Sequence, residues 1–123
     1  MILIDYSDKC PIYEQIVERF RTLILNGVLE AGEKIPSVRE LAVELSINPN
    51  TIQRAYGELE RDGFVYSVKG KGSFVCADQT AVEKEKEKML QTLEEQFRAC
   101  KEAGITATDV MRCVTTVFGE VNL

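Results

Sequence analysis

Apolar residues recur at helical spacing in three segments of the first half of the chain, which predicts three amphipathic helices. The first segment begins near Pro11, a residue suited to the first position of a helix, and Gly27 ends it. Its apolar positions are Ile12, Ile16, Phe20, Leu23 and Ile24. The second segment places its stripe at Val38, Leu41, Ala42 and Leu45. The third places it at Ile52, Ala55, Tyr56 and Leu59, so Tyr56 is expected in the core.

The second and third helices carry clear start signals. Ser37 and Glu40 match a capping box, in which each side chain satisfies a free backbone amide at a helix start. Residues 46–48 interrupt the pattern, and Asn48 followed by Pro49 marks the next start. The third helix is expected to end at residues 62–63. Two short helices joined by a three-residue turn are typical of a helix-turn-helix.

Two runs rich in aromatic and β-branched residues follow, at residues 64–68 and 73–76. They bracket the sequence KGKG at residues 69–72, which predicts a hairpin with a basic, glycine-rich tip. A brief strand is expected around Lys34 and Ile35. A helix-turn-helix followed by a basic hairpin is a winged helix.

The composition changes near Asp78, where a helical tail is predicted. Residues 82–88 read VEKEKEK, typical of a solvated helix with internal ion pairs. Gly104 interrupts the tail, and Thr106 with Asp109 resembles the capping start of a last helix.

The two tail helices carry apolar stripes that a single pair of helices cannot bury, which suggests packing against a second copy. The first stripe is Met89, Leu93, Phe97 and Cys100. The second is Val110, Val114, Val117 and Val121, with Met111 and Phe118 beside it. The spacing does not distinguish packing against a second copy from packing of the two helices within one chain. A ligand pocket at the first stripe is a further alternative. The predicted fold is α+β: a winged helix-turn-helix domain in residues 1–77 and a two-helix dimerisation tail in residues 78–123.

Composition narrows the function by exclusion. The 123 residues include no histidine, which rules out a Ser-His-Asp triad, a Cys-His dyad and His-containing zinc sites. The four cysteines form no C-x-x-C pair and are interpreted as buried apolar residues in a reducing compartment. The glycine and lysine positions of the hairpin do not match a phosphate-binding loop. We therefore expect that the protein is not an enzyme and that it binds neither a cofactor nor a metal ion. No signal peptide or membrane span is evident, so a cytoplasmic location is expected.

Charge is distributed unevenly along the chain. The formal net charge is −5, with −2 in residues 1–77 and −3 in the remainder. Residues 48–57 and 64–77 nevertheless contain no acid. The polar face of the third helix carries Asn50, Gln53, Arg54 and Gly57. Positive charge therefore lies where a winged helix would touch DNA, on the third helix and at the hairpin tip.

The sequence IPSVRELAVELSINPNTIQRAYGELERDGFVYSVKGKGSFV, at residues 35–75, resembles the DNA-binding domain of the GntR family of bacterial transcription regulators. The resemblance covers residues 11–76. It lies in the P-S-x-R-E-L entry to the second helix, the N-P-N-T start of the third, and the G-K-G hairpin. The short tail further resembles the YtrA-type subfamily, whose members dimerise through it and lack a large effector domain.

The resemblance implies residue roles. DNA contact is assigned to Ser37, Arg39, Asn48, Asn50, Thr51, Gln53, Arg54, Lys69, Gly70 and Lys71. Arginine can form bidentate hydrogen bonds with a phosphate or a guanine, and Asn or Gln can form them with adenine. Dimerisation is assigned to Met89, Leu93, Phe97, Val110, Val114, Val117, Phe118 and Val121. Pro49 and Gln53 stand where some members of the family carry basic residues. The base preference of those members is therefore not assigned to this chain.

The leading hypothesis is a homodimeric, sequence-specific repressor that binds a palindromic operator in double-stranded DNA. The resemblance implies control of its own or a neighbouring operon, often one for an ABC transporter, and allows an unidentified small-molecule effector. No membrane partner is expected. The alternative is a winged-helix adaptor that holds a protein partner without reading DNA, and the lack of acids around the third helix and the hairpin argues against it.

Overall fold

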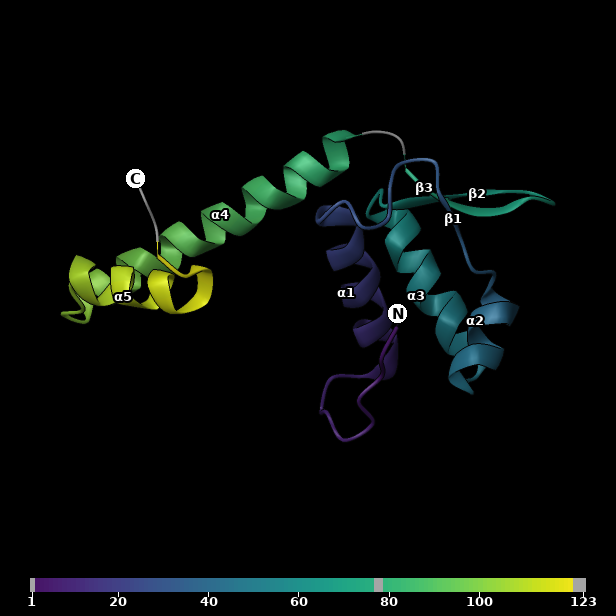
Figure 1. Cartoon of the computed structure of the whole chain (residues 1–123), viewed down its shortest axis with the longest axis horizontal. Coiled ribbons are helices and arrows are strands. Elements are labelled where there is room, and N and C mark those ends of the chain that lie inside the picture. Colours follow the sequence, from purple (N-terminus) through teal and green to yellow (C-terminus); the bar gives the residue numbers. More distant parts are fainter. Residues whose placement is uncertain (1, 77–78, 121–123) are drawn as a thin grey trace. The chain divides into compact units, whose positions relative to one another are not determined.

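The computed structural model describes residues 2–76 and 79–120. Three helices and three strands come first along the chain, and two further helices follow (Figure 1). The structure divides into two compact units, Met1–Glu83 and Lys84–Leu123, called here the winged unit and the tail unit.

The helices of the winged unit follow the predicted pattern. They are α1 (Ile12–Leu25), α2 (Val38–Leu45) and α3 (Pro49–Arg61). The expectation that Pro11 takes the first helical position is wrong by one residue: its ψ of 146° is extended, so Pro11 is the N-cap. Its carbonyl still accepts the first helical hydrogen bond, from the amide of Gln15 at 3.1 Å.

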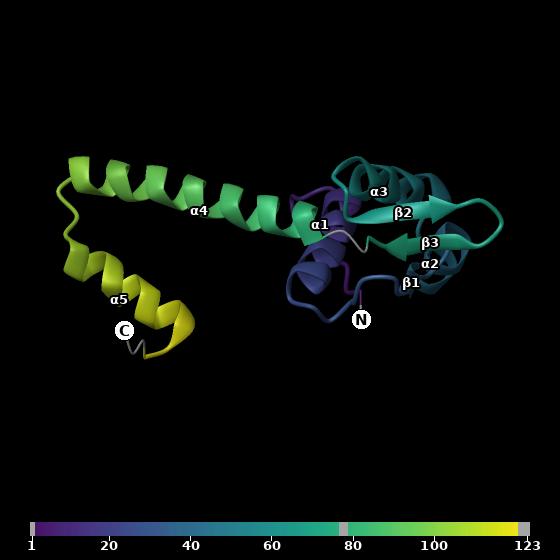
Figure 2. The same cartoon turned by 90° about the horizontal axis from the view of Figure 1, so that it is seen from above.

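A small antiparallel sheet completes the winged unit, in the order β1-β3-β2. The strands are β1 (Lys34–Ile35), β2 (Val65–Val68) and β3 (Gly72–Val75). The hairpin of β2 and β3 pairs Val65 with Val75 and Val68 with Gly72, and β1 adds Lys34 opposite Phe74. Figure 2 shows this hairpin beside α3. The predicted winged helix-turn-helix is confirmed.

The core of the winged unit is made from the predicted stripes. The largest fully buried side chains are Phe20, Phe64, Ile16, Ile35, Leu41, Ile52, Leu59 and Val75. Tyr56 is buried as expected, with its ring edge-on to Phe20 and the ring centroids 5.6 Å apart. Val82 also joins this core, and therefore the winged unit extends into the first turn of α4 (Gln79–Glu102).

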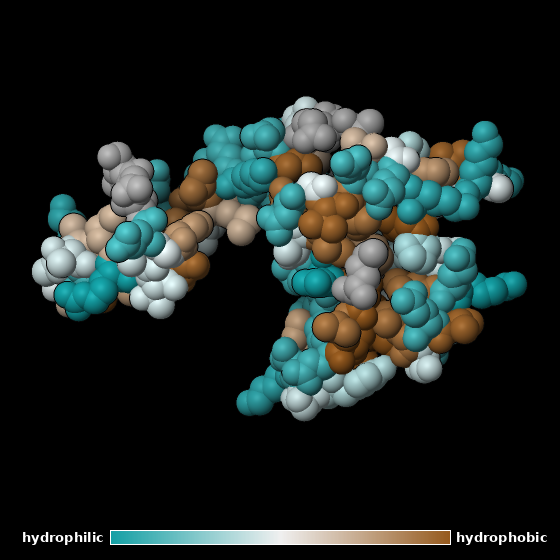
Figure 3. Space-filling view, in the orientation of Figure 1, coloured by the Kyte–Doolittle hydropathy of each residue, from teal (hydrophilic) through white to brown (hydrophobic). Residues whose placement is uncertain are grey.

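The tail unit contains the rest of α4 and α5 (Ala107–Phe118). Gly104, at φ +84°, lies between them. The predicted capping start is present: Thr106 Oγ1 accepts from the amide of Asp109 at 3.2 Å, and Asp109 accepts from the amide of Thr106 at 3.1 Å. These hydrogen bonds lower the pKa of Asp109 from its ordinary value. Apolar side chains lie at the surface of these helices (Figure 3).

The cysteines differ from expectation. None of the four is buried: Cys10, Cys76 and Cys100 are half-buried, and Cys113 is exposed. Cys113 lies on α5, which has no buried residue in the single chain, so a small apolar side chain gains no cover there. All four are free thiols.

Within residues 2–76 and 79–120, no helix is long and apolar enough to cross a membrane. The same residues contain no group of three or more Cys, Asp or Glu side chains that could hold a metal ion.

Candidate nucleic-acid interface

The turn between α2 and α3 has a specific backbone geometry. Ser46 takes the left-handed conformation at φ 55°, which ends α2 and turns the chain toward α3. The Asn48 side chain then accepts a hydrogen bond from the amide of Asn50 at 2.8 Å, with Pro49 at the first helical position. Asn48 is therefore the helix cap that the sequence predicts, and it stays exposed at the start of α3.

The start of α2 is held by its capping box and by α3. Ser37 Oγ accepts from the amide of Glu40 at 3.0 Å, and Glu40 accepts from the amide of Ser37 at 3.4 Å. The Tyr56 hydroxyl donates to the carbonyl of Pro36 at 2.7 Å, which ties this start to α3. Burial raises the pKa of Tyr56, and the carboxylates of Glu40 and Glu44 raise it further, so the hydroxyl stays a donor. Arg39 is thereby presented, exposed, on the first turn of α2.

The outer face of α3 presents polar and positively charged side chains. Asn50, Gln53 and Arg54 are exposed, whereas Thr51 is half-buried. A Cβ at Gly57 would have no described atom within 4 Å, so packing inside the chain does not demand glycine there. Close approach of a partner molecule is one reason to keep this face free of a side chain.

The hairpin tip forms the wing, at residues 69–71. Lys69 and Lys71 are exposed, and Gly70 has φ +78°, a conformation that favours glycine. The amide of Lys71 donates to the carbonyl of Val68 at 2.9 Å and closes the turn. The wing is also connected to α3, because the amide of Ser67 donates to Glu60 at 3.3 Å.

Lys34 is a cation near the wing that sequence reasoning missed. A Cβ at Gly72 would lie only 3.0 Å from Cε of Lys34, so the lysine stem crosses the first residue of β3, next to the hairpin tip. Gly72 has φ +116°, which also favours glycine. The only signal in the sequence is the predicted strand at Lys34, because its neighbour across the sheet is set by tertiary pairing.

The guanidinium of Arg54 lies over an aromatic ring of another helix. Its Cζ atom is 3.7 Å from the ring centroid of Tyr13 on α1. The spacing of residues on α3 predicts that Arg54 faces away from the core, and the side chain is exposed as expected. The contact with Tyr13 is a feature that the spacing did not predict.

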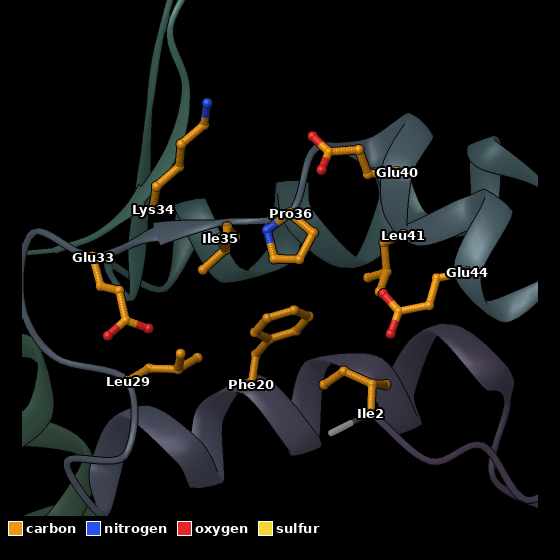
Figure 4. A pocket seen from close by; sticks show the side chains of 10 residues that line it. All are labelled: Ile2, Phe20, Leu29, Glu33, Lys34, Ile35, Pro36, Glu40, Leu41 and Glu44. Atoms are coloured by element: carbon orange, nitrogen blue, oxygen red, sulfur yellow. The ribbon is translucent and has the colours of Figure 1, made fainter.

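A crevice in the winged unit has the opposite electrostatic character. It has a volume of about 420 Å³, with apolar side chains such as Phe20 and Leu41 in its floor. Glu33, Glu40 and Glu44 stand around it, and Lys34 points away from it toward the hairpin (Figure 4). Phosphate oxygens are repelled by such a rim. The crevice therefore contrasts with residues 48–57, which include the start of α3, and with the wing, because neither segment contains an acid.

The predicted DNA residues lie on three adjoining elements. They occupy the start of α2, the outer face of α3 and the wing, and α3 packs against both α2 and β2. Figure 2 shows α3 along one side of the winged unit with β2 next to it. The structure leaves the individual DNA contacts as predictions.

The predicted dimerisation residues are exposed or half-buried in the tail unit. Met89, Leu93, Phe97, Val117 and Phe118 are exposed, Val110 and Val114 are half-buried, and Val121 lies outside the described residues. An apolar groove of about 560 Å³ lies between the end of α4 and α5. It is lined by Phe97, Cys100, Lys101, Ile105, Thr106, Ala107, Val110 and Met111.

Comparison with known proteins also indicates a DNA-binding regulator. Residues 12–75 match the family model described as bacterial regulatory proteins, gntR family. Over 123 residues the chain is 35% identical to the HTH-type transcriptional repressor YtrA of Bacillus subtilis, covering 98% of the chain and 95% of that protein.

Solved structures of transcription regulators superpose on this chain. A GntR family transcriptional regulator from Listeria monocytogenes superposes with a TM-score of 0.76 at 39% identity, over 90% of this chain and 98% of that one. The DNA-binding domain of AraR in complex with its operator superposes with a TM-score of 0.55 at 32% identity, over 62% of this chain and 95% of that one.

Proposed function

The chain belongs to the gntR family of bacterial regulatory proteins, and we propose that it is a homodimeric repressor that reads an inverted-repeat operator through α2, α3 and the wing. It is a DNA-binding transcription regulator, not an enzyme. The proposal concerns how it binds DNA, how many copies act together and what binding does to transcription.

The observation that carries the DNA-binding mode is the outer face of α3. It combines exposed Asn50, Gln53 and Arg54 with an open position at Gly57, and residues 48–57 contain no acid. Amide and guanidinium groups match the hydrogen-bonding edges of adenine and guanine in the major groove. The helix therefore supplies direct readout, with Arg39 beside it on α2.

The wing supplies charge next to this readout. Lys69 and Lys71 are exposed at the tip, and the side chain of Lys34 lies against Gly72 next to the tip. Cations of this kind neutralise phosphates and contribute affinity that falls with salt. We assign Lys34 to the same role as the two wing lysines.

Two copies are proposed because the tail unit leaves its apolar stripes uncovered. Val117 and Phe118 are 78% and 79% exposed, and Phe97 lines an open groove. A second chain that covers these faces gives a twofold dimer, which places two copies of α3 on half-sites about one helical turn apart. The division into a DNA-binding domain and a dimerisation tail is part of this proposal.

Repression is supported by the similarity to the HTH-type transcriptional repressor YtrA of Bacillus subtilis. We propose that the target is its own or a neighbouring operon. A regulator of this kind works where the chromosome is, which supports a cytoplasmic location. The groove between α4 and α5 offers one place for an effector if a dimer leaves it open.

The test is selection of duplexes from a random library by the full chain, followed by anisotropy titration at about 0.15 M salt. The selected duplexes should contain an inverted repeat and bind at least about a thousandfold tighter than scrambled ones. Equal, weak binding of all duplexes would reject the proposal.

A further inference from the structure

The contact between Tyr13 and Arg54 joins two helices at the edge of the proposed DNA surface. Tyr13 is in the first turn of α1, and Arg54 is on the outer face of α3. Cζ of Arg54 lies 3.7 Å from the centroid of the tyrosine ring, so the guanidinium is in van der Waals contact with the ring face. No predicted DNA residue lies on α1, so the proposed reading of DNA assigns a role to Arg54 and none to Tyr13.

Stacking leaves the hydrogen-bond donors of Arg54 available. A guanidinium is planar, and all five N–H bonds point outward in that plane. Cζ of Arg54 lies over the tyrosine ring, and an aromatic ring does not take up N–H donors as a carboxylate does. A phosphate or a base edge can therefore approach the rim of the group while the ring still supports its face.

The ring of Tyr13 is itself well held. It is half-buried and packs against the core of the winged unit. Its hydroxyl donates to Glu14 at 3.1 Å. That hydrogen bond, with burial second, raises the pKa of Tyr13, so the phenol stays neutral near pH 7. The ring is a fixed platform, in contrast to the long, flexible side chain that rests on it.

A free arginine has to give up several rotatable bonds when it binds DNA. An arginine already stacked on a fixed ring has lost part of that freedom before binding. Glu58 follows Arg54 by one helical turn on α3, a spacing at which opposite charges can pair on a helix surface. The contact with the Tyr13 ring is an alternative to that ion pair.

We propose that Tyr13 is a positioning residue that preorganises Arg54 of the recognition helix for contact with DNA, and this rests on the proposed DNA contact of Arg54. The proposal gives α1 a part in DNA affinity without requiring that Tyr13 touch the duplex. It predicts that the aromatic ring matters and the hydroxyl does not.

The test is a double-mutant cycle on the full chain, with a labelled duplex selected by the wild-type protein as the probe. Arg54→Ala and Tyr13→Leu should each weaken binding about fivefold or more, the scale of an exposed cation–π contact. In the Arg54→Ala background, Tyr13→Leu should change the affinity less than about twofold. Tyr13→Phe keeps the ring and should bind within about twofold of wild type.

A second readout separates positioning from general stability. In the free protein, the Nε–Hε NMR signal of Arg54 should show a ring-current shift that Tyr13→Phe keeps and Tyr13→Leu removes. Thermal unfolding of each variant checks that the fold is intact, and Tyr13→Met replaces Tyr13→Leu if the latter does not fold.

The outcomes distinguish the two levels of the proposal. If Arg54→Ala binds like wild type, the DNA contact of Arg54 is wrong and the inference falls with it. If Arg54→Ala weakens binding but Tyr13→Leu does not, or weakens it equally in both backgrounds, only the positioning role is overturned. Strong coupling that Tyr13→Phe leaves intact supports it.

Discussion

The winged unit and the tail unit are both built from amphipathic helices, but they differ in what covers the apolar faces. Ile16 of α1 and Ile52 of α3 are fully buried by other parts of the winged unit. In the tail unit, no described side chain from Lys84 to Glu120 is buried. The local signals are equally good in both, since α2 and α5 each begin with a complete capping box.

This difference in burial indicates where each unit obtains its stability. Full burial of a large apolar side chain contributes about 1.5–3 kcal/mol, and the winged unit gains this from its own chain. The tail helices gain little of it alone, and isolated helices are marginal in water. We therefore expect the winged unit to carry the DNA surface as a self-contained fold and the tail unit to depend on a second chain.

The largest expected effect comes from a charge placed in the uncovered groove. Phe97→Asp should convert the dimer to monomer, because burying an unpaired carboxylate in an interface costs at least about 2 kcal/mol, or thirtyfold in dissociation constant. Sedimentation equilibrium measures the shift. Gln96→Asp adds the same charge at the neighbouring exposed position and should leave the dimer intact. Equal behaviour of the two variants would mean that the groove is not the interface.

Next in size are the side chains assigned to readout. Arg39→Ala and Gln53→Ala should each weaken operator binding by about 1–3 kcal/mol while leaving scrambled duplexes much less affected. Anisotropy titration measures both. Arg98→Ala and Gln91→Ala, exposed positions on α4, are the matched controls and should bind normally. Wild-type affinity in both α2 and α3 variants contradicts the assignment.

Gly57→Ala should separate stability from DNA binding. Alanine favours a helix over glycine by up to about 1 kcal/mol, and no described atom obstructs its Cβ. Urea unfolding should therefore show a gain in stability, while the added methyl on the outer face of α3 weakens operator binding. A variant that is more stable and binds as tightly as wild type shows that DNA does not approach Gly57 closely.

The smallest effect is expected at the wing. Lys71→Ala should weaken all duplexes to a similar extent and reduce the slope of log affinity against log salt by about 1 per protomer. Lys86→Ala removes the same charge from the solvated part of α4 and should not change the slope. A loss confined to the operator would instead assign Lys71 to base readout.

Features set by neighbours in the sequence could be predicted, whereas those set by tertiary contact could not. The capping boxes at Ser37 and Thr106, the Asn48 cap and the glycine-rich hairpin follow from local backbone chemistry. The approach of Lys34 to Gly72 and the stacking of Arg54 on Tyr13 depend on pairing between distant segments. The cysteines were expected in the core because small apolar residues usually lie there, but Cys113 is on a helix that a single chain leaves uncovered.

The central claim is that the winged unit reads DNA and the tail unit brings two copies to one site. Native mass spectrometry of the full chain on a selected duplex tests it most directly. The account predicts two chains per duplex for the wild type, and only weakly bound single chains for Phe97→Asp. One chain per duplex at full affinity, with the wild type monomeric when free, would contradict it.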